Sequence, residues 1–239
     1  MDIILITYYI CIGVGVTASS LMGFFIGKKA GLPPSALKSY VAIAVVTGIF
    51  SALLMGQLQN FIMSLTSLPY YPSRLRIFGV LLFMPVFLFL FAKMLGGDYN
   101  KVMDAFTPGT YVMLGISKIG CAVYGCCYGI ACTPGVTTQF EEHTVFPVQL
   151  LECVLCLAIG LSAYLFSKRK NHITGSVYPL SLILYGVTRF FSEYLRYYPE
   201  AERTYFFGVS FWQMIAVICV AVGIISVAVR LIHKTNPQQ

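Results

Sequence analysis

Four ionisable side chains of this 239-residue chain fall inside long apolar runs: Lys118, Glu152, Arg189 and Glu193. An unpaired charge at the centre of a bilayer costs at least a few kcal/mol, so such residues pair, face a bundle interior and mark functional paths. We therefore predict a polar site formed by these residues. The alternative is a structural ion pair that only holds helices together.

One predicted helix carries two of these charges and a further arginine on a single face. Glu193 follows Arg189 by four positions and Arg196 lies three further on, which is helical spacing. Arginine offers planar forks that fit phosphate or carboxylate, and Glu193 can hold one of them in place. The pattern favours an anionic ligand, for which a phospholipid headgroup is the natural candidate.

Amide side chains accompany the charges. Gln149 and Glu152 are three positions apart just after Pro147, which suits the first turn of a helix, so they share a face. Gln213, near the start of the last apolar run, is either a ligand of the site or an interfacial hydrogen-bond partner.

A cysteine-rich stretch holds four of the eight cysteines: Cys121, Cys126, Cys127 and Cys132. They could act as small apolar residues in a closely packed helix, as the other four cysteines do. A redox role is the second reading, because Cys132 lies near the outer face, where disulfides persist, and two of the thiols are adjacent. A single cluster without a nearby histidine gives little support to metal binding, so we predict no metal and no cofactor.

Long apolar helices must position these residues. The chain is 58% hydrophobic and 10% charged, whereas soluble domains are about a quarter charged, and its apolar runs are long enough to cross a bilayer. We predict an all-α, polytopic membrane bundle in one transmembrane domain, residues 1 to 239. Its seven helices are expected near residues 3 to 26, 40 to 66, 77 to 96, 106 to 130, 147 to 166, 177 to 198 and 210 to 232. The fourth, glycine-rich and with Lys118 inside, could be broken or re-entrant.

The positions of the basic residues predict the orientation, because lysine and arginine collect on the cytoplasmic side. One set of helix ends has four, Arg74, Arg76, Arg196 and Arg203, and the other set has ten. The amino terminus should lie outside and the carboxyl terminus in the cytoplasm. The ten basic residues at the cytoplasmic helix ends are Lys28, Lys29, Lys38, Lys93, Lys101, Lys168, Arg169, Lys170, Arg230 and Lys234.

The basic residues behind the net charge of +7 are scattered over short loops and form no basic stripe, which argues against nucleic-acid binding.

Several motifs resemble one family. Residues 104 to 108 read DAFTP, residues 115 to 121 GISKIGC, residues 125 to 129 GCCYG, residues 146 to 152 FPVQLLE, and residues 189 to 196 RFFSEYLR. They resemble prolipoprotein diacylglyceryl transferase, a bacterial membrane enzyme that moves diacylglyceryl from phosphatidylglycerol onto a lipoprotein cysteine. In its signature, G-R-x-G-N-F-x-N-G-E-x-x-G, the arginine is replaced by Lys118, the asparagines by Cys121 and Tyr124, and the glutamate by Cys126.

The resemblance implies a site, partners and a location. The donor would be phosphatidylglycerol or another anionic phospholipid, the acceptor a lipoprotein precursor or another nucleophile, and the location the bacterial cytoplasmic membrane. Cationic side chains would hold the phosphoglycerol headgroup and neutralise charge on the leaving phosphate. The implied catalytic residues are Arg189, Glu193, Arg196 and Glu152, and the implied substrate-binding residues are Lys118, Gln149, Tyr128, Gly125 and Gln213.

Two family histidines are absent. Phe78 stands where the family has the histidine of its H-G-G segment, and Phe146 replaces a second histidine. Attack by a cysteine thiol needs a base or another route to thiolate, so the first replacement leaves that step without its usual helper. Two alternatives stay open: a lipid-binding descendant without chemistry, and a membrane thiol-redox protein that uses the four clustered cysteines. A transporter ranks third, because no internal repeat is present.

Overall fold

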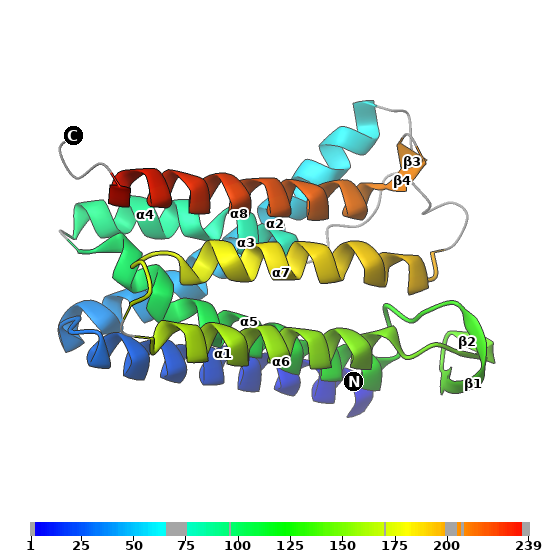
Figure 1. The fold of residues 1–239 in the computed structure, drawn as a ribbon. Helices are drawn as coiled ribbons and strands as arrows, with labels where there is room; N and C mark the ends of the chain where they lie inside the picture. Colours follow the sequence, from blue (N-terminus) through cyan, green and yellow to red (C-terminus); the bar gives the residue numbers. More distant parts are fainter. Residues whose placement is uncertain are drawn as a thin grey trace.

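The computed structural model describes residues 3–65, 76–95, 97–169, 171–198, 205–206 and 208–235. Long helices lie side by side along one bundle (Figure 1). In chain order the helices are α1 (Ile3–Lys29), α2 (Pro34–Leu65), α3 (Ile77–Leu82), α4 (Met84–Met94), α5 (Tyr99–Tyr124), α6 (Val148–Ser167), α7 (Val177–Ser192) and α8 (Phe211–Thr235).

The seven predicted helical segments are present, with α3 and α4 forming one segment interrupted by a turn at Phe83. Five of the seven are long and apolar enough to cross a membrane: α1, α2, α3 with α4, α6 and α8. The chain is a polytopic membrane protein. The start of α1 and the end of α8 lie at opposite ends of the bundle (Figure 1), as an odd number of crossings requires. Thr66, Arg74, Lys170 and Arg203, which enter the sequence-based predictions, lie outside the described residues.

The fourth helical segment differs from its predicted bounds. It is a continuous helix, α5, that begins at Tyr99 because the Asp98 carboxylate accepts the backbone N–H groups of Asn100 and Lys101 at 3.0 and 3.3 Å. It ends at Tyr124, and not near residue 130, because Gly125 adopts the left-handed conformation with φ of 80°. The alternative of a broken or re-entrant fourth segment is therefore wrong.

Small residues let α5 pack closely against α1 and α6. A Cβ added to Gly109 would lie 2.7 Å from the Ser19 carbonyl oxygen in α1, and one added to Gly160 of α6 would lie 3.1 Å from the Pro108 carbonyl oxygen. Backbones approach this closely in membrane bundles only where side chains are minimal. The glycines thus allow α5 to pack closely against α1 and against α6, which contributes Glu152 to the site.

We expect Gly109→Ala to lower the stability of the bundle by about 1–3 kcal/mol, the usual cost of overpacking. The added methyl group meets backbone atoms of Ser19, which have no rotamer to adopt. Gly13→Ala is the matched control, because nothing lies within 4 Å of its added Cβ and alanine favours the helix. Thermal unfolding in detergent measures both; equal midpoints for the two variants would contradict the close α1–α5 contact.

Two β-hairpins, which the sequence analysis did not predict, lie at one end of the bundle (Figure 1). The first joins β1 (Ala131–Thr138) to β2 (Glu141–Val145), and the second joins β3 (Tyr205–Phe206) to β4 (Val209–Ser210). The first occupies the connector after α5, where β-branched residues favour extended backbone. We call this end of the molecule the hairpin end.

The end of α7 also differs from its predicted position, because the helix stops at Ser192 and not near residue 198. A 3₁₀ turn, η1 (Glu193–Leu195), follows, and Arg196 is extended with ψ of 142° and pairs with Gly129. The early end agrees with the sequence, because Tyr198 precedes a proline and such residues avoid helical backbone. Arg196 therefore belongs to a bent strand-like segment beside the loop that follows α5.

Asp104 fixes α5 to the start of α7 at the opposite end of the bundle. Its buried carboxylate accepts the backbone N–H groups of Gly175 and Val177 at 2.7 and 3.1 Å, and His172 Nε2 lies 3.3 Å away. An anionic side chain at a helix N-terminus is favourable because it meets unpaired N–H groups. This contact holds the relative position of two helices that carry charges at their other ends.

Candidate functional site

Glu152 lies at the centre of a buried cluster of charges contributed by three helices and the segment after η1. Its carboxylate contacts Lys118 Nζ at 2.6 Å, Arg189 NH1 at 2.9 Å and Arg196 NH2 at 2.7 Å. Arg196 adds a second hydrogen bond, from Nε to Oε1 at 3.1 Å, so this pair is bidentate. The structure thus brings together charges from α5, α6 and α7 that are far apart in sequence.

Glu193 is the second carboxylate of the cluster. Its Oε2 lies 2.6 Å from Arg189 NH2, and its Oε1 accepts a hydrogen bond from the Ser210 hydroxyl at 3.1 Å. Arg189 therefore bridges the two glutamates, one through each terminal nitrogen. We use the name charge cluster for Lys118, Glu152, Arg189, Glu193 and Arg196.

Three cations and two carboxylates leave the charge cluster with one net positive charge. Burying an uncompensated charge is costly, so a site of this kind favours a bound anion. Arginine and lysine also carry several N–H donors each, more than the two carboxylates accept. The arrangement is suited to a phosphate, which presents several acceptor oxygens to planar guanidinium forks.

The charge cluster lies near the hairpin end and not at mid-bundle. Glu152 is the fifth residue of α6 and Arg189 lies in the last turn of α7. Lys118 is six residues before the end of α5, or about 9 Å at a rise of 1.5 Å per residue. All three residues therefore lie toward the end of the bundle that carries the hairpins.

A small hollow borders the charge cluster, with room for about one water molecule. Lys118, Glu152, Arg189 and Ser192 form its polar wall, and Leu114 and Leu155 are among its apolar lining residues. The hollow therefore lies where charged side chains of the cluster meet apolar side chains of the bundle.

Gln149 connects α6 to the cysteine-rich loop. Its side chain is buried, and its Nε2 donates to the backbone carbonyl of Cys126 at 2.8 Å. The predicted shared face with Glu152 therefore exists, but this amide nitrogen holds the loop in place. Its role toward a ligand remains a prediction.

Gln213 forms a reciprocal cap with Ser210 at the start of α8. The Gln213 Oε1 accepts the Ser210 backbone N–H at 2.9 Å, and the Ser210 hydroxyl accepts the Gln213 backbone N–H at 3.1 Å. Gln213 Nε2 also donates to the Phe190 carbonyl at 3.4 Å. The structure therefore shows Gln213 in one of its two predicted roles, that of an interfacial hydrogen-bond partner. The Ser210 hydroxyl also donates a hydrogen bond to Glu193.

Gly125 and Tyr128 lie in the loop that packs on the first hairpin. The Gly125 carbonyl accepts the Thr138 hydroxyl at 2.9 Å, and an added Cβ would lie 2.6 Å from that hydroxyl oxygen. The Tyr128 hydroxyl donates to Glu141 Oε1 at 2.5 Å, and its ring stacks on Tyr197 with centroids 5.5 Å apart. These contacts position the loop, and contact with a ligand stays a prediction for both residues.

Two serines of the site were missed in the sequence analysis. The Ser192 hydroxyl lies 3.4 Å from both Arg189 NH1 and Glu152 Oε1, and Ser210 contacts Glu193. Ser192 carries no distinctive sequence signal. Ser210 does, because a serine followed three positions later by glutamine is a capping pattern.

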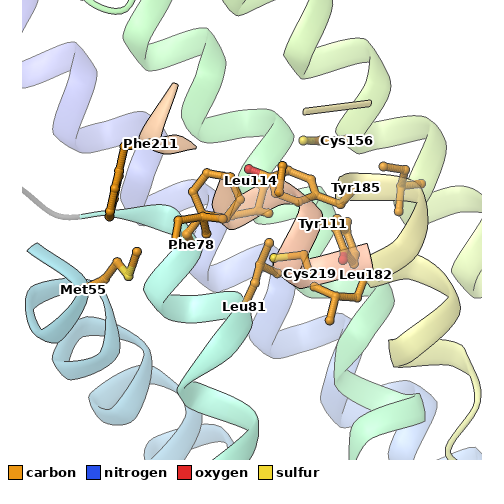
Figure 2. Close-up of a cluster of buried hydrophobic side chains, with 13 residues drawn as sticks. Met55, Phe78, Leu81, Tyr111, Leu114, Cys156, Leu182, Tyr185, Phe211 and Cys219 are labelled. Carbon is orange, nitrogen blue, oxygen red and sulfur yellow. The ribbon is translucent and has the colours of Figure 1, made fainter. Parts of the chain in front are cut away.

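Phe78 fills the space beside Arg189 where the family resemblance implies a histidine. Its buried ring stacks on Trp212 with centroids 5.5 Å apart, packs edge-on against Tyr185 at 5.7 Å, and lies 5.9 Å from the Arg189 guanidinium carbon. Figure 2 shows Phe78 and Tyr185 within one apolar cluster. Among the described histidines, His143 pairs with Glu141 on the hairpin and His172 pairs with Asp104 at the other end.

Three of the four predicted redox cysteines converge. The Sγ atoms of Cys121, Cys126 and Cys127 all lie within 4.8 Å of one another, and each thiol is free. The fourth, Cys132, lies on β1 and its thiol contacts the Pro134 carbonyl at 3.3 Å. We use the name thiol cluster for the first three.

Comparisons with known proteins agree with the motif resemblance across the whole bundle. The sequence model of the family described as prolipoprotein diacylglyceryl transferase matches residues 2–229. Over 231 residues the chain is 24% identical to the phosphatidylglycerol–prolipoprotein diacylglyceryl transferase of Clostridium tetani, covering 91% of this chain and 90% of that protein. Over 207 residues it is 24% identical to the phosphatidylglycerol–prolipoprotein diacylglyceryl transferase 2 of Clostridium perfringens, covering 82% and 80%. The chain therefore belongs to the prolipoprotein diacylglyceryl transferase family.

Proposed function

We propose that this protein transfers diacylglyceryl from phosphatidylglycerol, or another anionic phospholipid, to the cysteine thiol of a lipoprotein precursor in the bacterial cytoplasmic membrane. The observation that carries the proposal is the net positive charge cluster at the hairpin end. Its excess of cations suits a phosphate, and the family relatives named above are transferases that use this donor.

The reaction forms a carbon–sulfur bond and breaks a carbon–oxygen bond. The acceptor sulfur attacks the glyceryl carbon that bears the phosphate ester, and the electron pair of the broken bond leaves on the phosphate oxygen. The thiol proton passes to solvent or to the released glycerol phosphate. The phosphate thereby changes from a singly charged diester to a monoester that carries about −1.5 to −2 near neutral pH.

The charge cluster would stabilise this increase in negative charge. Lys118, Arg189 and Arg196 are held by carboxylates before the reaction, so their donors need no large reorganisation as charge develops. Glu193 would orient Arg189, and Glu152 would keep the three cations close together.

A transfer assay tests the function directly. Purified protein in nanodiscs receives phosphatidylglycerol labelled in its acyl chains and a peptide with a lipoprotein cysteine; labelled peptide is the expected product. Phosphatidylethanolamine with the same label is the matched donor control, and a cysteine-to-serine peptide is the acceptor control. Binding of phosphatidylglycerol without any transfer would support the non-catalytic descendant instead.

Lys118→Met should weaken phosphatidylglycerol binding by roughly 10–100-fold, because one hydrogen bond to a charged group contributes about 1.5–3 kcal/mol. The variant removes one cation and leaves both arginines with their glutamate partners. Titration of nanodiscs that contain increasing fractions of the anionic lipid measures the change. An unchanged affinity would place the phosphate elsewhere.

A further inference from the structure

The thiol cluster brings three sulfur atoms together at the end of α5. Close helix packing would not require this convergence, and a disulfide would require only two of the thiols. Cys121 lies in the last turn of α5, and Cys126 and Cys127 follow Gly125, the left-handed residue that ends the helix. Cys127 itself has a φ of 60°, and it is the one non-glycine residue with positive φ among the described residues. This unusual backbone reverses the chain direction and brings its thiol to the other two.

Three converging thiols form a donor set for a thiophilic metal ion. Zinc bonds thiolate sulfur at about 2.3 Å, so three sulfurs around one tetrahedral ion lie about 3.8 Å apart. The three Sγ atoms already lie within 4.8 Å of one another, and small side-chain rotations close the difference. As whole residues, Cys127 is exposed and Cys121 and Cys126 are half-buried.

The thiol cluster lies next to the charge cluster. Cys121 is one helical turn beyond Lys118 on α5, and residues three apart on a helix are neighbours. Gln149 of α6, three residues before Glu152, holds the Cys126 carbonyl at 2.8 Å. On the far side of the loop, the Tyr197 backbone N–H donates to the Tyr128 carbonyl at 3.2 Å, directly beside Arg196.

We propose that Cys121, Cys126 and Cys127 bind one zinc ion whose fourth coordination position receives the thiol of the acceptor. The proposal rests on the proposed function and deepens it. Zinc with three protein ligands keeps an open position for water or substrate, and a thiol that coordinates it is deprotonated. Copper(I) is satisfied by three thiolates and would leave no such position, so zinc is the ion that the chemistry favours.

The zinc would provide a route to the acceptor thiolate, which the phenylalanine at position 78 cannot provide because it is not a base. In the transfer step the bound acceptor sulfur gives up its proton to solvent and takes the metal as its counter-ion. The sulfur then forms its bond to the glyceryl carbon while the carbon–oxygen bond breaks and the electron pair leaves with the phosphate. The resulting thioether is a weaker ligand than a thiolate and dissociates, which returns the open position. No oxidant or reductant is consumed.

Metal binding is measured without lipid or acceptor. Reduced protein in detergent is titrated with zinc against a chromogenic chelator, and cobalt is used in parallel because thiolate ligation gives it a charge-transfer absorption. We expect one ion per chain. Cys127→Ser should weaken binding by more than the roughly 10–100-fold that loss of an outer ligand partner costs. Cys132→Ser is the matched control, because this thiol lies outside the cluster and should leave the affinity unchanged.

Three results would overturn the proposal. They are zinc binding that is equal in wild type and Cys127→Ser, the absence of thiolate-to-cobalt charge transfer in the cobalt titration, and a reversible disulfide within the thiol cluster in protein that binds no metal. Should Cys127→Ser fail to fold, Cys126→Ala and Cys121→Ser provide the same comparison, and the thermal midpoint with and without zinc reports binding through stabilisation.

The transfer assay separates the zinc proposal from the proposed function. Loss of transfer after zinc removal, with recovery on adding zinc but not magnesium, supports both. Full transfer by metal-free protein would overturn the catalytic role of zinc and leave the transferase function standing. Tight zinc binding without transfer under any condition would count against the transferase function, while the metal site itself would stand.

Discussion

Arg189→Lys is expected to lower the rate of diacylglyceryl transfer by about 100–1,000-fold, the usual effect of removing one preorganised donor from a site of developing charge. Arg189 spans two carboxylates, with NH1 at 2.9 Å from Glu152 and NH2 at 2.6 Å from Glu193. A lysine ammonium is a single point charge and cannot occupy both positions of the planar fork. The net charge of the cluster is unchanged, so the loss would report geometry.

The separate changes in kcat and KM of Arg189→Lys show at which stage of the reaction Arg189 acts. If Arg189 acts mainly on the leaving phosphate, kcat should fall much more than KM rises, because the interaction strengthens only as the phosphate gains charge. Arg230→Lys is the matched control: this arginine lies near the end of α8, where it contacts Ser226 and Asn100 far from the charge cluster. Retention of most of the activity by Arg189→Lys would contradict the assigned role.

Much of the site was predictable because helical spacing and burial constrain charges strongly. The isolated charges at Lys118, Glu152 and Arg189 had to find partners within the membrane, and the structure pairs all of them. Which helices meet is a tertiary property, and single-helix patterns did not reveal that Glu152 would be the centre. The resemblance to the family narrowed the ligand to a phospholipid headgroup.

Other features escaped prediction because local and long-range effects compete. The apolar run after Lys118 predicted a helix to residue 130, but the left-handed Gly125 ends it and allows a hairpin to follow. Arg196 was expected on the helical face of Arg189, yet it reaches Glu152 from extended backbone instead. The long and flexible arginine side chain makes the same ion pair possible from either backbone.

The convergence of the three thiols of the thiol cluster depends on one turn that the sequence analysis did not predict. In sequence, Cys121, Cys126, Cys127 and Cys132 lacked the regular spacing of a zinc site. The reversal at Gly125 and Cys127 brings three of them together and leaves Cys132 on the hairpin. The positive φ of Gly125 is the usual helix-ending conformation of glycine, but that of Cys127 is not apparent from residue type, because cysteine rarely adopts positive φ.

Glu152→Gln is expected to destabilise the folded protein by about 3–5 kcal/mol, because removing one partner of a buried ion pair leaves uncompensated charge. The effect should be at the upper end, since Lys118, Arg189 and Arg196 all lose their shared carboxylate at once. Unfolding in detergent, followed by circular dichroism, measures the loss, and transfer activity should disappear with it. Wild-type stability in this variant would mean that the cluster is solvated and its ion pairs contribute little.

A compensating change distinguishes lost charge balance from lost packing. Adding Lys118→Met to Glu152→Gln restores the original net charge of the cluster while leaving both arginines and Glu193 in place. Contacting residues are not additive, and we expect a favourable coupling energy of about 1–3 kcal/mol between the two sites. The double variant should therefore be more stable than Glu152→Gln alone, yet remain inactive because the arginines have lost the carboxylate that orients them. Strictly additive effects would instead indicate that Glu152 stabilises the bundle mainly through its hydrogen bonds to the arginines, since these remain broken in both variants.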